Sequence, residues 1–485
     1  MKEDQQKTEI VVLGAGLAGL AAADKLASQG AGVMVIEKEN SVGGMCRSLA
    51  QDGFIFDLGG HRFLPHNQQT ADYVSSLFPV PGELALRDRL SQIYLKGKFL
   101  AYPPEFADIL KNLGPITCLK SGIDSLYFRL TSHLFRLPAE ISLKDWMMRR
   151  FGPTLYDIYF GPYSYKLWGR KTSGISAEWA SQRISVPNMG LALRNLLFKK
   201  DKHIKTYARQ FVYPQGGIGQ IPRRIAEHAS AAGARILTGH RLAEICPQAQ
   251  GFLLTVVSRD GTPRKILADK VISTIPLNEF IFSFRPLPPA DVLDAARGLH
   301  LRSVRFLNVM LDTSQITSNT WIYVPERKFI FFRIQEVCNW HPANCPPGKT
   351  ALTLEVACEE GGRLWRMPDA DLLKFCVHDL AKMGIAVENK ILGYFSTYAP
   401  HAYPVYLLDY KERLRKIYAY LQGFDPLVIA GRQGRFRYLN MDAALEEGFL
   451  AARALDDENN RREMFSCDER KDYTEKGLYL KINAR

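Results

Sequence analysis

Residues 9–26 read EIVVLGAGLAGLAAADKL, and this stretch decides the fold of the N-terminal part of the chain. The run EIVVL is apolar and rich in β-branched residues, as in a buried strand, whereas the segment from Ala18 onward contains no helix breaker. Gly14, Gly16 and Gly19 stand between the two in the pattern GxGxxG. The sequence therefore predicts a strand, a tight turn and a helix, in that order.

A second apolar run, AGVMVI at residues 31–36, ends in Glu37. An acid at about this distance from the glycine turn is typical of dinucleotide-binding folds, where it binds ribose hydroxyls. The glycines permit the turn, a close approach of the backbone to a pyrophosphate and tight helix packing, and the helix N-terminus favours the anion. The candidate cofactor-binding residues of this unit are Gly14, Gly16, Leu17, Ala18, Gly19, Glu37 and Lys38.

Two glycine pairs follow the acid. Residues 41–48 read SVGGMCRS and contain the first pair, and the second pair, Gly59-Gly60, directly precedes His61. A simple nicotinamide dehydrogenase has no use for these glycines. The arrangement resembles the FAD-binding signature of the superfamily that contains amine oxidases, protoporphyrinogen oxidases, phytoene desaturases and UDP-galactopyranose mutases.

This resemblance implies an α/β fold with a Rossmann-like FAD-binding domain of the GxGxxG type. An inserted α+β substrate domain would contain an antiparallel sheet and a helical cap. It also implies FAD bound without a covalent tether, and more cofactor-binding residues, namely Gly43, Gly44, Arg47, Gly59, Gly60, His61, Leu242, Thr274, Gly431, Arg432, Tyr438, Asn440 and Met441. The alternative interpretation of Arg47, which the pattern makes the less favoured one, is a solvated surface arginine.

The C-terminal motif narrows the resemblance. Residues 431–442 read GRQGRFRYLNMD and look most like the corresponding motif of UDP-galactopyranose mutases. By that resemblance the substrate-binding residues are Tyr163, Trp168, Arg305, Arg333 and Tyr403, and the catalytic residues are His61, Arg305 and Arg333. Guanidinium groups suit diphosphate oxygens, although the three aromatic residues could equally fill a core.

Arg305 lies in an alternating run, Ser303–Leu311, where it shares one face with Leu307 and Val309. An arginine on an apolar face needs a counter-ion. We expect a ligand phosphate to be that counter-ion, unless a protein carboxylate takes its place.

Two departures leave the substrate open. Phe331-Phe332 stand where the mutase pattern has Tyr-Thr, and Tyr403-Pro404 are followed by an acid only at Asp409. Three functional classes therefore remain. The first is a redox flavoenzyme that uses the flavin N5. The second is a non-redox, mutase-like isomerase that needs reduced FAD, for which NAD(P)H is a candidate external reductant. The third is a flavin-dependent sensor without catalysis. Amine-oxidase-like or protoporphyrinogen-oxidase-like dehydrogenation of a small molecule is one form of the first class.

Composition sets limits on partners. The 485 residues are 46% hydrophobic and carry a net charge of +13, spread along the chain without the basic and aromatic tracts that bind nucleic acid. We expect an anionic substrate, such as a nucleotide sugar or a polyprenyl phosphate, or an anionic membrane surface. The polar N-terminus indicates a cytoplasmic protein, and the scattered cysteines predict no metal site. The sequence gives no indication of the oligomeric state.

The domains are expected to be discontinuous. The predicted FAD domain comprises 1–75, 205–285 and 415–460, the substrate domain 76–204 and 286–414, and a charged, solvated tail 461–485. Residues 105–137 are helical and too often interrupted by charge to span a membrane. They could instead contact the inner membrane surface peripherally or simply form part of the cap.

Overall fold

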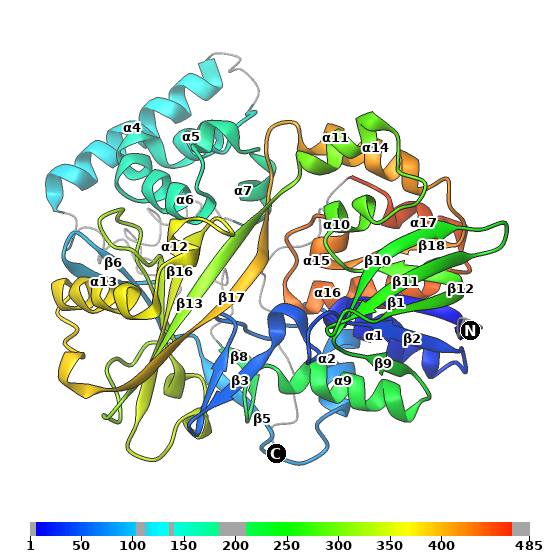
Figure 1. Ribbon diagram of the computed structural model, residues 1–485. Coiled ribbons are helices and arrows are strands. Elements are labelled where there is room, and N and C mark those ends of the chain that lie inside the picture. The colour runs from blue at the N-terminus through cyan, green and yellow to red at the C-terminus, as the bar shows by residue number, and fades with distance from the viewer. Residues whose placement is uncertain (1–5, 103–111, 113, 135–139, 184–209, 468–485) are drawn as a thin grey trace.

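Strand β1 (Gln6–Leu13) lies inside a seven-stranded sheet and leads through the glycine turn into helix α1 (Leu17–Ala27). The computed structural model describes residues 6–102, 112, 114–134, 140–183 and 210–467. Figure 1 shows two lobes, with β1 and α1 in one and the long strands β13 and β17 in the other. The strand, the glycine turn and the helix therefore follow one another in the order that the GxGxxG pattern predicts.

The first sheet is largely parallel where β1 lies. Its order is β10-β11-β12-β1-β2-β9, and β18 pairs with the C-terminal part of β12. Its remaining strands are β2 (Val33–Ile36), β9 (Arg235–Leu237), β10 (His240–Pro247), β11 (Phe252–Ser258), β12 (Pro263–Ser273) and β18 (Leu427–Ile429). Three distant parts of the chain thus build one α/β sheet, and the predicted Rossmann-like fold is confirmed.

The second sheet is mostly antiparallel, in the order β17-β13-β16-β15-β14-β6-β7. Its strands are β6 (Ser91–Leu95), β7 (Lys98–Ala101), β13 (His300–Leu311), β14 (Trp321–Tyr323), β15 (Arg333–Glu336), β16 (Thr350–Cys358) and β17 (Ile391–Val405). Leu307 and Val309 of β13 pack toward α13 (Asp369–Lys382), whereas Val304 and Phe306 pack with residues of the cap. This sheet therefore separates two apolar layers, one packed on α13 and the other on the cap.

Helices cover both sheets. The cap over the second sheet contains α4 (Pro115–Leu134), α5 (Leu143–Leu155), α6 (Gly161–Trp168) and α7 (Glu178–Arg183). The other helices are α2 (Gln68–Ser76), α9 (Gln220–Ala231), α10 (Leu277–Phe282), α11 (Ala290–Arg297), α12 (Arg363–Arg366), α14 (Tyr410–Leu421), α15 (Gly431–Gly434), α16 (Met441–Ala454) and α17 (Glu458–Met464). Short hairpins pair β3 (Ser48–Gln51) with β4 (Phe54–Asp57) and β5 (Leu84–Asp88) with β8 (Gln210–Pro214). No helix in the described part of the chain is long and apolar enough to cross a bilayer.

The predicted solvated tail is corrected in its first part. Helix α17 packs against α16, and Met464 and Phe465 are buried in the cores of the first lobe. Met464 and Phe465 are buried although charged residues surround them in the sequence, because one face of a short helix is enough to bury two apolar side chains. The rest of the tail, 468–485, and parts of the predicted helical region 105–137 lie outside the described residues.

Gly448 allows α16 to approach α1. A Cβ there would overlap the Ala18 carbonyl oxygen and lie 2.7 Å from the Ala21 Cβ. We expect Gly448→Ala to lower the free energy of unfolding by roughly 1–3 kcal/mol, because a well-packed interior cannot accept the methyl group without displacement. Gly122→Ala in α4, where a Cβ meets nothing within 4 Å, is the control and should be neutral or slightly stabilising in thermal unfolding. Equal stability of Gly448→Ala and the wild type would contradict this packing.

Candidate active site

The glycine turn closes tightly on one side and stays open on the other. Gly14 has φ +96°, and a Cβ there would lie 2.5 Å from Thr274 Oγ1, while a Cβ on Gly19 would overlap the Gly14 carbonyl. At Gly16, by contrast, a Cβ would meet nothing within 4 Å. Gly16 is also the N-cap of α1 and has no side chain to satisfy the amides of the first turn. The open side of the turn is therefore suited to an anion.

Three cavities run from this turn into the space between the lobes. We name them by one residue each: the Glu37 cavity, the Gly16 cavity and the Arg333 cavity. The first two share Gly16, Gly44, Met45, Thr274 and Gln433, and the last two share Met45, His61, Arg432, Asn440 and Met441. Shared walls make them one elongated cleft, as an extended dinucleotide requires.

The Glu37 cavity lies beyond the end of β2. The Glu37 carboxylate accepts hydrogen bonds from the amides of Ala15 (2.7 Å) and Glu39 (2.9 Å), so it is fixed beside the glycine turn. Arg47 donates to the Gly44 carbonyl (3.0 Å) and pairs with Glu39. Other predicted cofactor residues on its walls are Gly14, Gly16, Lys38, Gly44, Leu242 and Thr274. Gly19 lies behind the turn and serves packing.

The Gly16 cavity joins α1 to the C-terminal motif. Its walls include the predicted residues Leu17, Ala18, Gly43, Gly431, Arg432, Asn440 and Met441. Arg432 donates to the carbonyls of Leu439 and Ala402, which orient its guanidinium group without neutralising it. Burial raises the pKa of the Cys46 thiol in this wall to about 12, so the sulfur is held protonated.

The Arg333 cavity contains the other predicted flavin and substrate residues. Gly59, Gly60, His61, Arg333, Tyr403 and Tyr438 all line it. Arg333 forms two parallel bonds to the fully buried Glu355, at 2.6 and 2.7 Å, across the β15–β16 pair. The rings of Tyr403 and Tyr438 stack at 5.5 Å, with the Arg432 guanidinium 4.9 Å from the Tyr438 ring. These contacts fix Arg333 relative to Glu355, and Tyr403, Tyr438 and Arg432 relative to one another.

His61 is neutral in this cavity. Burial and the positive charge of Arg432 lower the pKa of His61 to about 3. Its Nδ1 lies 3.1 Å from the Gly59 carbonyl oxygen, which can only accept, so Nδ1 is the donor. The other ring nitrogen is therefore available as an acceptor at neutral pH.

Residues that no sequence motif marked complete the walls. Arg62, Arg89, Tyr102, Trp179, Trp321 and Tyr323 also line the Arg333 cavity. The Arg62 guanidinium lies 3.4 Å from the centre of the Trp321 ring and donates to Ser91 Oγ (3.0 Å) and Thr320 Oγ1 (2.9 Å). Arg62 directly follows the glycine pair and His61 in the sequence, so its position next to this motif could have identified it as a site residue. The others come from loops, helix α7 and strand β14, which only the fold brings together.

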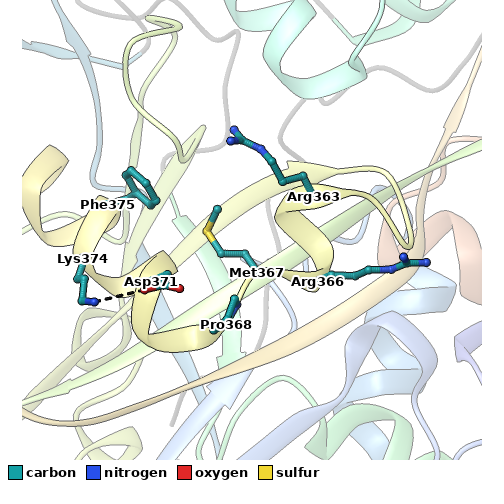
Figure 2. A pocket seen from close by; sticks show the side chains of 7 residues that line it. All are labelled: Arg363, Arg366, Met367, Pro368, Asp371, Lys374 and Phe375. Carbon is teal, nitrogen blue, oxygen red and sulfur yellow. Dashed lines mark hydrogen bonds and ion pairs between the residues drawn. The ribbon is translucent and has the colours of Figure 1, made fainter.

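Arg305 is not a site residue, and this expectation is wrong. Its side chain is fully buried on the α13 side of β13, where it pairs with Asp369 and donates to the carbonyls of Leu364 and Met367. A protein carboxylate therefore supplies the counter-ion that was expected from a ligand. Arg305 anchors the turn between α12 and α13, whose outer surface forms a shallow depression lined by Arg363 and Phe375 among others (Figure 2).

Trp168 and Tyr163 stand behind the cavity wall. Trp168 is 2% exposed, packs against Tyr403 and Trp179, and is not among the lining residues. Tyr163 contacts Tyr323 edge to face, with ring centres 5.9 Å apart. The structure thus places Trp168 as a support for Tyr403, which corrects its expected direct contact with the substrate.

A glycine turn at the start of α1, an acid at the end of β2 and one continuous cleft define a dinucleotide-binding protein. Residues 17–456 match the model of the family of flavin containing amine oxidoreductases. The chain belongs to this family and is an FAD-dependent enzyme of it.

Individual relatives agree on the fold. A reduced UDP-galactopyranose mutase is 22% identical, with a TM-score of 0.77 over 92% of this chain and 93% of that one. A putrescine oxidase bound to putrescine is 18% identical, with a TM-score of 0.64 over 93% and 99%. A 4,4'-diapophytoene desaturase from Staphylococcus aureus (strain Newman) is 55% identical over 51 residues, 10% of each chain. The chain thus matches only about a tenth of the length of these curated desaturases.

The residues present fit FAD. The open side of Gly16, the uncapped start of α1 and the fixed Glu37 carboxylate suit a diphosphate and a ribose. Gly60, where a Cβ would lie 2.6 Å from Trp321, lines the far end of the cleft beside His61. The cleft therefore has one end for each half of the cofactor.

Glu37→Ala should weaken FAD binding about 10- to 100-fold, because a charge-assisted hydrogen bond is worth roughly 1.5–3 kcal/mol. The measurement is flavin absorbance per chain after gel filtration in flavin-free buffer. Glu9→Ala is the control, since Glu9 also accepts from a backbone amide (Gly32, 3.0 Å) but lines none of the three cavities. Full flavin occupancy of Glu37→Ala in dilute solution would refute the ribose assignment.

Arg305→Ala should destabilise the protein by about 3–5 kcal/mol, because it removes a fully buried charge that holds Asp369 and two carbonyl groups. The midpoint of urea unfolding measures this loss, and the FAD content of the folded fraction should stay unchanged. Arg297→Ala removes an exposed ion pair with Asp294 and should change the midpoint little. A stable Arg305→Ala protein that has lost its affinity for anions would restore the substrate role.

Proposed function

We propose that this flavoenzyme acts on a phosphate-bearing, anionic substrate bound in the Arg333 cavity. The observation that carries the proposal is the composition of the cavity wall. Four arginines, Arg62, Arg89, Arg333 and Arg432, line it, and no Asp or Glu is among its described lining residues. When bound, FAD would supply the redox-active isoalloxazine ring, with N5 as the reactive centre.

The described charged side chains of this wall are all positive. Glu355 pairs with Arg333 from behind the wall, whereas Arg432 donates to carbonyl oxygens, which leave its charge in place. The neutral His61 adds no negative charge. A cationic amine would be repelled by this wall, and an anion attracted, because few water molecules screen charges inside a cavity. The wall therefore disfavours amine oxidation within this family.

The non-redox alternative retains specific support. Arg333 and Tyr403, which match the mutase pattern, both line the cavity, although Arg305 does not. In that alternative the arginines would hold the diphosphate of a nucleotide sugar, and NAD(P)H would serve to reduce the flavin. A requirement for reductant without consumption of oxygen would favour the isomerase, and substrate-dependent reduction of the flavin would favour the oxidoreductase.

The same proposal includes FAD held without a covalent bond. Cys46 lies in the wall of the Gly16 cavity, but its thiol is kept protonated by burial and is a poor nucleophile. The Nδ1 of His61 is directed to the Gly59 carbonyl group. Neither side chain is therefore prepared to form a tether.

Arg89→Gln tests the anion site. Arg89 is partly exposed at the wall, so its loss should spare the fold while it lowers the affinity of the FAD-loaded protein for pyrophosphate and UDP by about tenfold or more. Calorimetric titration at constant ionic strength measures the affinity.

Arg297→Gln is the matched control, because it removes the same charge from an exposed ion pair on α11, away from the cleft. It should bind both ligands as the wild type does. The proposal is overturned if neither ligand binds the wild type, or if putrescine binds more tightly than pyrophosphate.

A further inference from the structure

Helix α4 carries a stripe of apolar side chains that are exposed in the described part of the chain. Ile116, Leu119, Ile123, Leu126 and Tyr127 are between 58% and 71% exposed. Their spacing of three and four residues puts them on one face of the helix. A monomeric protein rarely leaves so continuous an apolar surface in water without a function for it.

The helix is attached to the molecule by its other side. The Asp124 carboxylate accepts a hydrogen bond from the Thr154 amide (2.9 Å), next to Gly152 of α5, whose position leaves no room for a Cβ against Asp124. Helix α4 packs on α5, and the stripe residues keep more than half of their surface exposed. Figure 1 places α4 at the outer edge of the cap, away from the first lobe.

An exposed basic side chain, that of Lys120, adjoins the stripe. The α4 sequence, PITCLKSGIDSLYFRLTSHL, has more basic residues than acidic ones, and its one acid, Asp124, is hydrogen-bonded to α5. An exposed Ile141 (63%) precedes α5, and the first turn of α5 contains an exposed Lys144. Apolar and basic side chains on one helix match the interface of an anionic bilayer.

We propose that α4 docks the protein on the surface of an anionic lipid membrane. The stripe enters the boundary between headgroups and acyl chains, and Lys120 contacts the headgroup phosphates. The helix lies in the plane of the membrane, because it is not apolar enough to cross it. A second copy is a poorer fit to this surface, since a symmetric contact would bring the Lys120 side chains of both copies into one apolar interface. The proposal is independent of the substrate of the Arg333 cavity.

Sedimentation with lipid vesicles tests it. The full-length, FAD-loaded protein should bind vesicles of equal parts phosphatidylcholine and phosphatidylglycerol, bind phosphatidylcholine vesicles far less, and be partly released by salt. Ile123→Gln/Leu126→Gln should lower the affinity for the anionic vesicles about tenfold, because two exposed apolar side chains no longer enter the interface. The control, Leu287→Gln/Leu392→Gln, removes two exposed leucines outside α4 (61% and 49% exposed) and should bind as the wild type.

Lys120→Glu is a second variant, with the stripe intact, and should weaken binding to the anionic vesicles alone. The flavin spectrum and pyrophosphate affinity of each variant verify its fold, and failure of pyrophosphate to bind the wild type would affect only the proposed function. The docking proposal is overturned if the wild type ignores anionic vesicles or if the α4 variants bind as well as it does. It is equally overturned if light scattering shows a wild-type dimer that the Gln variant dissociates, since the stripe would then be a subunit contact.

Discussion

Contact between backbones at the start of α1 determines where the rest of the cofactor cleft can lie. Thr274, at the end of β12, donates to the Leu13 carbonyl (2.8 Å), and α1 leaves the turn so close to it that Gly14 and Gly19 leave no room for side chains. On the other side α16 is held against α1 at Gly448. Three elements from distant parts of the sequence thus converge on one turn, and the open space at Gly16 is what their convergence leaves free.

Two arginine–carboxylate ion pairs of the second lobe have different structural roles. Arg305 and Arg333 each pair with a carboxylate, but on opposite faces of one sheet. Arg305 is closed in by α12 and α13 and holds a turn in place, whereas Arg333 keeps one side toward the cavity while Glu355 fixes the other. Burial of a paired charge contributes little net stability, so each pair matters chiefly for the position that it enforces.

This arrangement explains which features of the fold and the site could be predicted from the sequence. The glycine turns and Glu37 could be located from sequence because their function depends on local geometry, which a short motif encodes. Alternation in β13 correctly separated Arg305 from Phe306, but it could not say which face adjoins the cleft, because that depends on where α13 packs. Arg89 and Trp321 were missed for the same reason: they meet only through the pairing of β6 with β14.

Helix α17 limits how far the chain can be shortened. Arg435 pairs with the buried Glu447 and also donates to the carbonyls of Glu463 and Ser466, while Arg437 donates to Ser466 as well. A protein ending after Leu455 would leave two nearly buried guanidinium groups without these acceptors, directly beneath the motif that forms one wall of the cleft. The smallest cofactor-binding fragment of this chain therefore has to extend past Ser466, although the last predicted cofactor residue is Met441.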